Sequence, residues 1–242
     1  MRDCFIIFFR SNLIMDKIMN IKEKAINCVE ALKKEYPDAI CSLEAKDPLQ
    51  LLIATRLSAQ CTDARVNLVT PVLFEKYPSL DAFCEADVGD IEKIIHSCGF
   101  FRAKAKDIVG MAKKIKSDFN CQVPDSIEKL TSLPGVGRKT ANLIMGDVYK
   151  KPAVVADTHL IRITNLLGLV SVKDPYKVEL ALKEILPPEE SNDFCHRVVL
   201  HGRAVCVARR PDCENCCLNE FCDYFRNKKE PSKKNEKNCK NY

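Results

Sequence analysis

The amino-acid sequence predicts an all-α fold. Apolar residues recur at helical spacing along most of the chain, whereas alternating β patterns are scarce. Breaks that contain Pro, Gly or Asp come roughly every 12 to 20 residues, which is a typical interval between the ends of successive helices. The chain has 242 residues, of which 46% are hydrophobic. This is enough for one large or two small domains with hydrophobic cores.

Taken in order, the apolar periodicity and the breaks define eleven expected helices: 18–36, 48–59, 63–76, 79–86, 90–97, 102–119, 125–133, 138–149, 158–168, 175–186 and 191–205. The ends of the chain differ from the rest. Residues 1–17 include the apolar run CFIIFF, which is too short for a signal-peptide core, so we expect an extension or an over-called start. Residues 226–242 are rich in Lys, Asn and Glu, and we expect a disordered polar tail.

The distribution of charge and the length of the apolar runs limit the kinds of partner that this protein can bind. Lys and Arg number 38 against 33 Asp and Glu, a mild basic excess that permits a polyanionic partner without requiring one. The excess is local, because residues 102–116 (RAKAKDIVGMAKKIK) carry six basic side chains and one acidic one. Such a run is also common on the solvated face of a helix. No run of 18 apolar residues exists, so we expect no membrane span.

A short segment between two expected helices has the character of an anion site. The sequence LPGVGRK (133–139) places two glycines in three residues, and these allow a tight turn with positive φ. The backbone N–H groups at the start of the next helix have no intrahelical partner, and the helix dipole also favours negative charge there. A Pro-Gly pair can simply link two helices. The following Arg138 and Lys139 nevertheless favour phosphate binding.

Fourteen cysteines are present, and four of them form a separate group. Cys206, Cys213, Cys216 and Cys222 follow the spacing C-x6-C-x2-C-x5-C, so four thiolates can surround one metal centre. Zinc is one alternative, but zinc sites usually use two short C-x2-4-C knuckles. One short knuckle with longer flanking loops suits a 4Fe-4S cluster better. Cys217 adjoins Cys216 and could take its place.

These segments together resemble the endonuclease III family, the helix-hairpin-helix DNA glycosylases with an iron-sulfur cluster. The resemblance rests on LPGVGRKTA (133–141), VADTH (155–159) and the four-cysteine run, and is extended by LSAQCTD (57–63) and LHGR (200–203). Its most specific part is the cysteine spacing combined with Lys139 inside the hairpin and Asp157 at 18 residues after it.

The resemblance implies two helical domains with a DNA-binding cleft between them. A six-helix domain with the helix-hairpin-helix would cover 38–152, and an iron-sulfur domain would combine 18–37 with 153–225. It also implies a monomer that binds duplex DNA with damaged bases or abasic sites. With no export signal, we expect a cytoplasmic location, associated with the nucleoid in a bacterium.

The implied activity is that of a bifunctional DNA glycosylase and abasic-site lyase for oxidised pyrimidines. Lys139 would attack the sugar C1′ as a neutral amine and form a Schiff base, after which the strand breaks by β-elimination. Asp157 would help to deprotonate Lys139 and stabilise the cationic sugar. Each residue has a simpler alternative role: Lys139 could be a phosphate contact, and Asp157 could be the N-cap of the next helix.

Other positions would contact DNA. The hairpin would hold a phosphate through the amides of Gly135, Val136 and Gly137, with Arg138 beside them. Gln60 would fill the gap left by a flipped base, and Phe100 would either wedge between bases or belong to the core. Two basic residues beside the cluster would face DNA: Arg209 and Arg210.

Three other functions are possible alternatives to a bifunctional glycosylase and lyase: a DNA-binding module, a zinc-binding regulator and an adenine-mismatch glycosylase. A helix-hairpin-helix module that only binds DNA would need neither Lys139 nor Asp157, and a zinc-binding regulator would be colourless rather than yellow-brown. The adenine-mismatch glycosylase of the same superfamily lacks the lyase lysine. The presence of Lys139 therefore favours the bifunctional enzyme.

Overall fold

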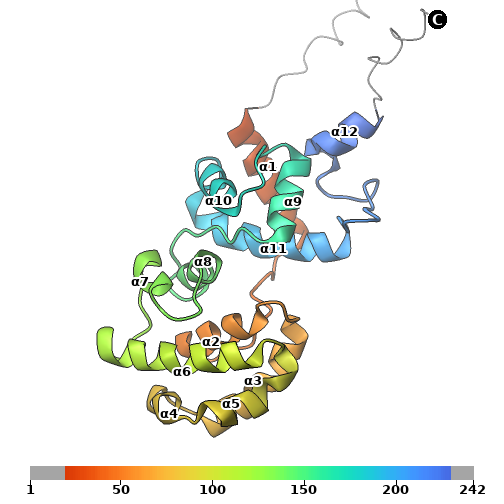
Figure 1. Cartoon of the computed structure of the whole chain (residues 1–242). Helices are drawn as coiled ribbons and strands as arrows, with labels where there is room; N and C mark the ends of the chain where they lie inside the picture. The colour runs from red at the N-terminus through yellow and green to blue at the C-terminus, as the bar shows by residue number, and fades with distance from the viewer. Residues whose placement is uncertain (1–19, 230–242) are drawn as a thin grey trace, which may run out of the picture.

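The computed structural model describes residues 20–229, and this part of the chain is helical without any strand (Figure 1). The expected extension at 1–17 lies outside the described residues, as does the tail from 230 onward. The helices form two lobes, which we call the hairpin lobe and the cysteine lobe. The prediction of an all-α fold with two helical domains is confirmed.

The hairpin lobe has one core, to which residues between 43 and 153 contribute. The longest helix, α6 (Phe101–Asp118), packs against α4 and α5 on one side and α2 on the other, and buries Ile108, Met111 and Ala112. The remaining elements of this lobe are α2 (Pro48–Ser58), α3 (Asp63–Lys76), α4 (Leu80–Glu85), α5 (Val88–Ile95), the 3-10 turn η1 (His96–Cys98), α7 (Ile127–Thr131) and α8 (Arg138–Asp147).

The cysteine lobe brings the start and the end of the described chain together. Its core joins residues 25–32 to residues between 154 and 218, with Phe194 and Leu32 fully buried at its centre. The Lys24 ammonium contacts the Asp223 carboxylate at 2.7 Å and thereby links the first helix to the last. The elements are α1 (Ile21–Glu35), α9 (Thr158–Leu167), α10 (Pro175–Lys183), η2 (Pro188–Glu190), α11 (Ser191–Ala204), η3 (Asn219–Phe221) and α12 (Asp223–Lys229).

Each of the eleven expected helices coincides with an observed one, with differences mainly at the ends. The segment expected at 125–133 is the five-residue helix α7, which Ser126 caps through the N–H of Lys129 and which ends before Pro134. Helix α12 was not predicted, and its last four residues fall within the expected tail. Phe225, at 7% exposure, anchors it against the cysteine lobe.

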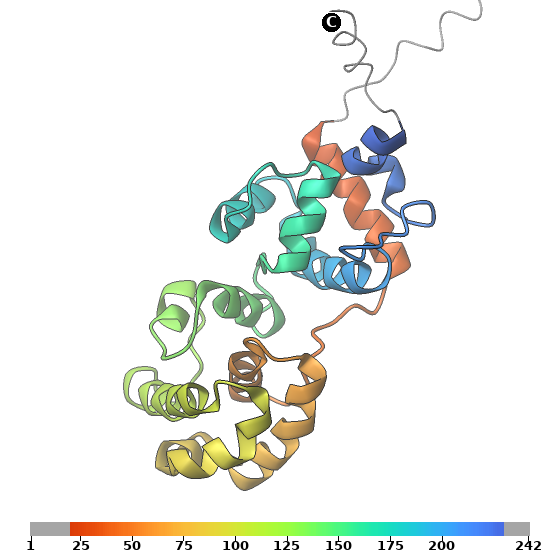
Figure 2. The same cartoon turned by 45° about the vertical axis from the view of Figure 1, so that its right-hand side comes forward.

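Two chain segments connect the lobes, around residues 36–47 and 148–157 (Figure 2). Leu143 packs against both cores. Polar links add to this contact, because Asp147 accepts hydrogen bonds from Asn192 and His196, each at 2.8 Å, and Arg203 pairs with Asp63 at 3.0 Å. Within residues 20–229 no helix combines the length and apolarity that a membrane crossing requires.

Candidate active site

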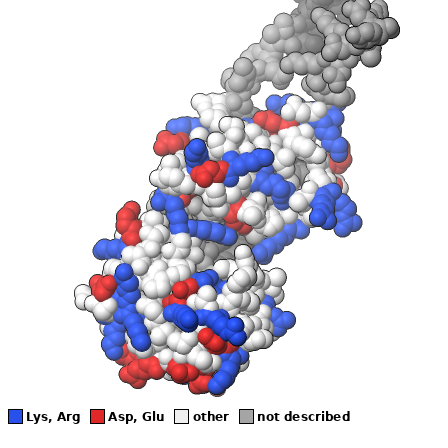
Figure 3. Space-filling model, viewed as in Figure 1, with Lys and Arg blue, Asp and Glu red and all other residues white. Residues whose placement is uncertain are grey.

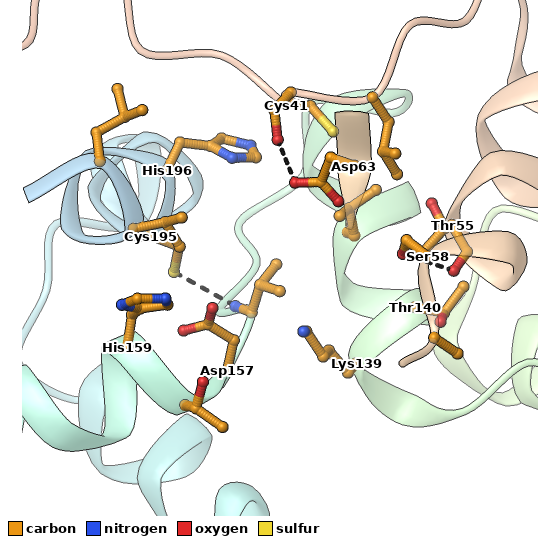
Figure 4. A pocket seen from close by; sticks show the side chains of 18 of the residues that line it. Cys41, Thr55, Ser58, Asp63, Lys139, Thr140, Asp157, His159, Cys195 and His196 are labelled. Carbon is orange, nitrogen blue, oxygen red and sulfur yellow. Dashed lines mark hydrogen bonds between the residues drawn. The ribbon is translucent and has the colours of Figure 1, made fainter. Parts of the chain in front are cut away.

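A pocket of about 390 Å³ lies where the two lobes meet (Figure 4). The hairpin lobe contributes Gln60 and Lys139, and the cysteine lobe contributes Asp157 and His159. The two residues expected to carry the chemistry therefore line one cavity, although they belong to different lobes. Lys and Arg side chains cover parts of both lobes and the boundary between them (Figure 3).

The two hairpin glycines lie in different surroundings. Gly135 has φ +72°, and a Cβ there would lie 2.5 Å from Nε of Arg56, whose guanidinium pairs with Asp107 at 2.7 Å. Gly137 has φ −92°, and a Cβ there would meet no atom within 4 Å. Nothing in the described chain therefore excludes a side chain at Gly137.

The hairpin presents fewer free amides than the sequence suggested. The N–H of Val136 donates to the carbonyl of Leu133 at 3.2 Å, and its contact with phosphate stays a prediction. The N–H groups of Gly135 and Gly137 find no acceptor among the described residues. Gly137 is the N-cap of α8 and supplies no side-chain bond, so the first-turn donors of α8 also stay open. The open amides at the start of α8 are suited to an anion, and their contact with phosphate stays a prediction.

Lys139 occupies the first turn of α8 and is exposed on the pocket wall. Its ammonium forms no ion pair within 4.0 Å among residues 20–229. The side chain extends into the open space between the lobes, where Asp157 lies on the opposite side (Figure 4). An unpaired lysine in a pocket is available to react with a bound molecule.

Asp157 caps a helix and also lines the pocket, so its position is compatible with both roles that the sequence left open. It is the N-cap of α9, and its Oδ1 accepts a hydrogen bond from the N–H of Leu160 at 2.7 Å. The residue is half-buried and lines the pocket. The cap bond uses Oδ1, and the second carboxylate oxygen has no protein donor among the described residues. The cap therefore fixes the side chain and leaves one oxygen for chemistry.

Arg138 differs from the free cation expected beside the hairpin. Its guanidinium forms two hydrogen bonds with the Glu179 carboxylate, at 2.7 and 2.9 Å, and lies 4.4 Å from the ring centre of Tyr176. Glu179 is 2% exposed and also accepts from Lys183. Burial acts to raise the pKa of Glu179, but these hydrogen bonds prevail and the pKa lies below its usual value. Arg138 thus ties the hairpin to α10, and its contact with DNA stays a prediction.

Gln60 and Phe100 share an unusual backbone conformation. Gln60 has φ +54° and Phe100 has φ +46°, which is the left-handed region that bulky residues rarely adopt. Gln60 is exposed and lines the pocket, while Phe100 precedes α6 with 69% of its surface exposed. This exposure excludes the core alternative for Phe100. Strained, exposed residues of this kind concentrate at functional sites.

The loop with Arg209 and Arg210 leaves both side chains exposed, and neither forms an ion pair among the described residues. Asp212 on the same loop accepts two hydrogen bonds from the Asn215 amide instead of neutralising either arginine. The two guanidinium groups are therefore available to an external anion. Their contact with DNA stays a prediction.

The four spaced cysteines surround one small cavity. Cys206, Cys213, Cys216 and Cys222 line it, whereas Cys217 is absent from the lining. The Arg162 guanidinium lies 3.5 Å from Sγ of Cys206, and Nε2 of His201 lies 3.3 Å from Sγ of Cys216. Burial, with Arg162 nearby, lowers the pKa of His201 to about 4.

The arrangement of these donors bears on the kind of centre they could hold. Within residues 20–229 no group of three or more His, Cys, Asp or Glu side chains converges on a single ion. The kind of metal centre that the four cysteines hold stays a prediction.

Two contributors were missed because only the fold brings them to the site. His159 lines the pocket with its Nδ1 buried and without a partner, and a Cβ at Gly202 would lie 2.5 Å from that atom. Glu179 lies 41 residues from Arg138. The segment VADTH includes His159, but neither its burial nor the pairing of Glu179 has a signal in the sequence.

Comparisons with known proteins agree with this geometry. Residues 53–188, more than half of the chain, match the model of the HhH-GPD superfamily base excision DNA repair proteins. Endonuclease III of Synechocystis sp. is 45% identical, with 86% of this chain and 96% of the relative covered. Endonuclease III of Bacillus subtilis is 37% identical over 85% and 94% of the two chains.

Solved structures give the same relationship. A trapped endonuclease III–DNA covalent intermediate has a TM-score of 0.80 and 38% identity, with 86% of this chain and 98% of that chain covered. A thermostable thymine-DNA glycosylase has a TM-score of 0.76 at 23% identity, and this likeness concerns the fold alone. The chain belongs to the HhH-GPD superfamily and, within it, to the endonuclease III family.

Proposed function

We propose that this protein is a DNA glycosylase and abasic-site lyase of base excision repair. The observation that carries the proposal is the pocket between the lobes, which Lys139 and Asp157 line together. Lys139 extends from the first turn of the hairpin helix, beside the open amides of Gly135 and Gly137. A DNA phosphate bound by these amides would therefore hold the strand next to the lysine.

The proposed reaction begins with a damaged base flipped out of the duplex into the pocket. The Lys139 amine attacks the sugar C1′, and the bond from C1′ to the base breaks, so the base leaves with the electron pair and is protonated. Opening of the sugar ring, in which the bond from C1′ to O4′ breaks and O4′ takes up a proton, gives the Schiff base between Lys139 and C1′. Loss of a proton from C2′ then expels the 3′ phosphate, and water later releases Lys139.

Asp157 serves this reaction through its charge. With Oδ1 held by the Leu160 amide, the carboxylate stays at the edge of the pocket. It accepts the proton that the Lys139 ammonium must lose and stabilises the positive charge that develops on the sugar. An electrostatic or general-base role of this kind is worth a factor of about 10² or more in rate.

We further propose that the described surface groups hold the DNA on both sides of the pocket. Arg209 and Arg210 would contact phosphates from the cysteine lobe, opposite the hairpin. Gln60 would occupy the space of the flipped base, and Phe100 would wedge between neighbouring bases. Its 69% exposure supports this, because a large apolar side chain in water gains by burial between bases.

The four cysteines around the small cavity, Cys206, Cys213, Cys216 and Cys222, would hold a 4Fe-4S cluster. Thiolates are the ligands of such clusters. When bound, the cluster would cross-link the segment between α11 and α12 and so hold Arg209 and Arg210 in place. We also propose the domain limits 38–152 and 18–37 with 153–225, a monomeric state, a cytoplasmic location and oxidised pyrimidines as the substrate class.

A panel of duplexes, each with one defined lesion, tests the proposal. Release of oxidised pyrimidines followed by strand cleavage at the resulting abasic site is the expected result. A protein that only binds DNA would release no base and cleave no strand, and this outcome would exclude the enzyme. Lys139→Gln, measured with the same duplexes, should retain DNA binding without cleavage.

A further inference from the structure

Lys104, on α6, is a buried cation whose role is not explained by packing alone. It is 1% exposed and forms no ion pair among the described residues. Its ammonium instead donates to two backbone carbonyls, those of Leu57 at 2.7 Å and Cys98 at 2.8 Å. Burial lowers the pKa of Lys104. Burial of a charge costs free energy, and the two hydrogen bonds to backbone carbonyls offset part of this cost.

The two carbonyls belong to segments that are distant in sequence, and these segments lead to Gln60 and Phe100, two of the five described non-glycine residues with positive φ. Leu57 lies in the last turn of α2, where carbonyls lack an intrahelical partner, and Gln60 follows it by three residues. Cys98 ends η1, and Phe100 follows it by two residues. The Lys104 ammonium therefore connects the segment that carries Gln60 to the segment that carries Phe100.

Left-handed backbone at non-glycine residues persists only where the surroundings over-determine it. Phe100 is the N-cap of α6 but offers no side-chain bond, and its carbonyl accepts from the N–H of Lys104 at 3.1 Å. Lys104 thus holds both ends of this turn, through its own amide and through its ammonium. The rest of the loop contains Gly99 with φ +68°, which adds no restraint.

We infer that Lys104 is a positioning residue that fixes Gln60 and Phe100 relative to each other for joint insertion into the DNA stack. This inference rests on the proposed function, in which Gln60 fills the space of the flipped base and Phe100 wedges beside it. Lys104 itself touches neither DNA nor the reacting sugar. Its contribution is confined to duplex substrates, because a single strand has no opposing stack to invade.

Lys104→Met tests the inference, since it removes the ammonium and retains most of the apolar stem. Excision of a lesion from duplex DNA should fall by about 10²-fold, the size expected for a misplacement of about 1 Å at a catalytic site. Cleavage at an abasic site in single-stranded DNA should stay within about twofold. Rates are expressed per molecule able to form a borohydride-trapped adduct, so unfolded protein does not count.

Two matched variants control for other effects. Lys106→Met removes an exposed positive charge from the same helix, and should leave both activities close to the parent. Thr164→Val removes a buried hydroxyl that donates to the Leu160 carbonyl at 2.7 Å in the other lobe, and so reports the effect of a lost buried hydrogen bond. If Lys104→Met yields no folded protein, Lys104→Gln serves instead, because its amide removes the charge but can still reach one carbonyl.

A double-mutant cycle separates positioning from general destabilisation. If Lys104 acts through Phe100, Lys104→Met combined with Phe100→Ala should excise no more slowly than the worse single variant. Losses that multiply, or equal losses on duplex and single-stranded substrates, would overturn the inference. Loss of trapping in the parent protein would instead overturn the proposed function, so the two failures are distinguishable.

Discussion

The substitution Asp157→Asn separates the catalytic role of Asp157 from its role as a helix cap, because it removes the negative charge and keeps a side-chain oxygen. The Asp157 Oδ1 accepts the Leu160 amide at 2.7 Å, and the side-chain oxygen of Asn can accept the same bond. The substitution removes only the negative charge near the start of α9, which is worth about 0.3–1 kcal/mol. At about 2–4 °C per kcal/mol for a chain of this size, the melting temperature should fall by no more than about 4 °C.

Excision should respond very differently from stability. Without the carboxylate charge, proton transfer from Lys139 and stabilisation of the cationic sugar are both weakened, and the rate should fall by at least about 10²-fold, or about 2.7 kcal/mol. The assay is single-turnover excision on a duplex with one lesion, with binding to abasic-site duplex measured in parallel. Binding should stay close to the parental value, because loss of an acid near phosphates cannot weaken attraction.

Two further variants complete the comparison. Asp157→Ala should lose the activity and also about 1 kcal/mol of stability, because the Leu160 amide loses its acceptor. Asp174→Asn is the matched control, since Asp174 caps α10 through the N–H of Lys177 at 2.9 Å and lies outside the pocket lining. Near-parental excision by Asp157→Asn would reduce Asp157 to a cap and refute its catalytic role.

Three further predictions concern the hairpin, the cysteines and the link between the lobes. Gly135→Ala should destabilise the protein, because φ +72° and a Cβ 2.5 Å from a neighbouring side-chain atom are both unfavourable. Gly137→Ala should fold normally and bind duplex DNA more weakly. Equal melting temperatures for the two variants would contradict this prediction. Cys206→Ala should lose the brown absorbance and much of the folded protein, whereas Cys217→Ala should keep both; a colourless Cys217 variant would show that the ligand set is wrong. The pKa of Glu179 lies below its usual value of 4.5, so the ionised carboxylate stabilises the fold above pH 4.5, and this stability is lost as the pH falls below 4.5. Glu179→Gln should therefore flatten the decline in unfolding free energy measured from about pH 6 to about pH 3. An unchanged slope would contradict the ion pair.

Much of the fold follows from the sequence because apolar periodicity and helix-ending residues act locally. The same holds for the hairpin, where Gly135 needs a positive φ that only glycine adopts without strain. Helix α12 was missed because a seven-residue basic segment has no local reason to be ordered. The Lys24–Asp223 contact and the burial of Phe225 hold it in place, and both depend on partners outside the segment.

The site was less predictable where the answer depends on three-dimensional partners. The pairing of Arg138 with buried Glu179 removes much of the free charge that the sequence suggested. The Val136 amide is used within the turn, which the glycine pattern could not reveal. For Phe100 the sequence left a wedge and a core position open, and neither its exposure nor its positive φ has a sequence signal.

The most direct test of the account asks which amine becomes bonded to DNA. Borohydride added during the reaction with an abasic-site duplex should reduce the Schiff base and leave a covalent protein–DNA adduct with the parent protein. Lys139→Gln should form no adduct, whereas Lys129→Gln, a matched change at an exposed lysine on the other helix of the hairpin, should form it normally. Undiminished trapping by Lys139→Gln would identify another nucleophile and contradict the central claim.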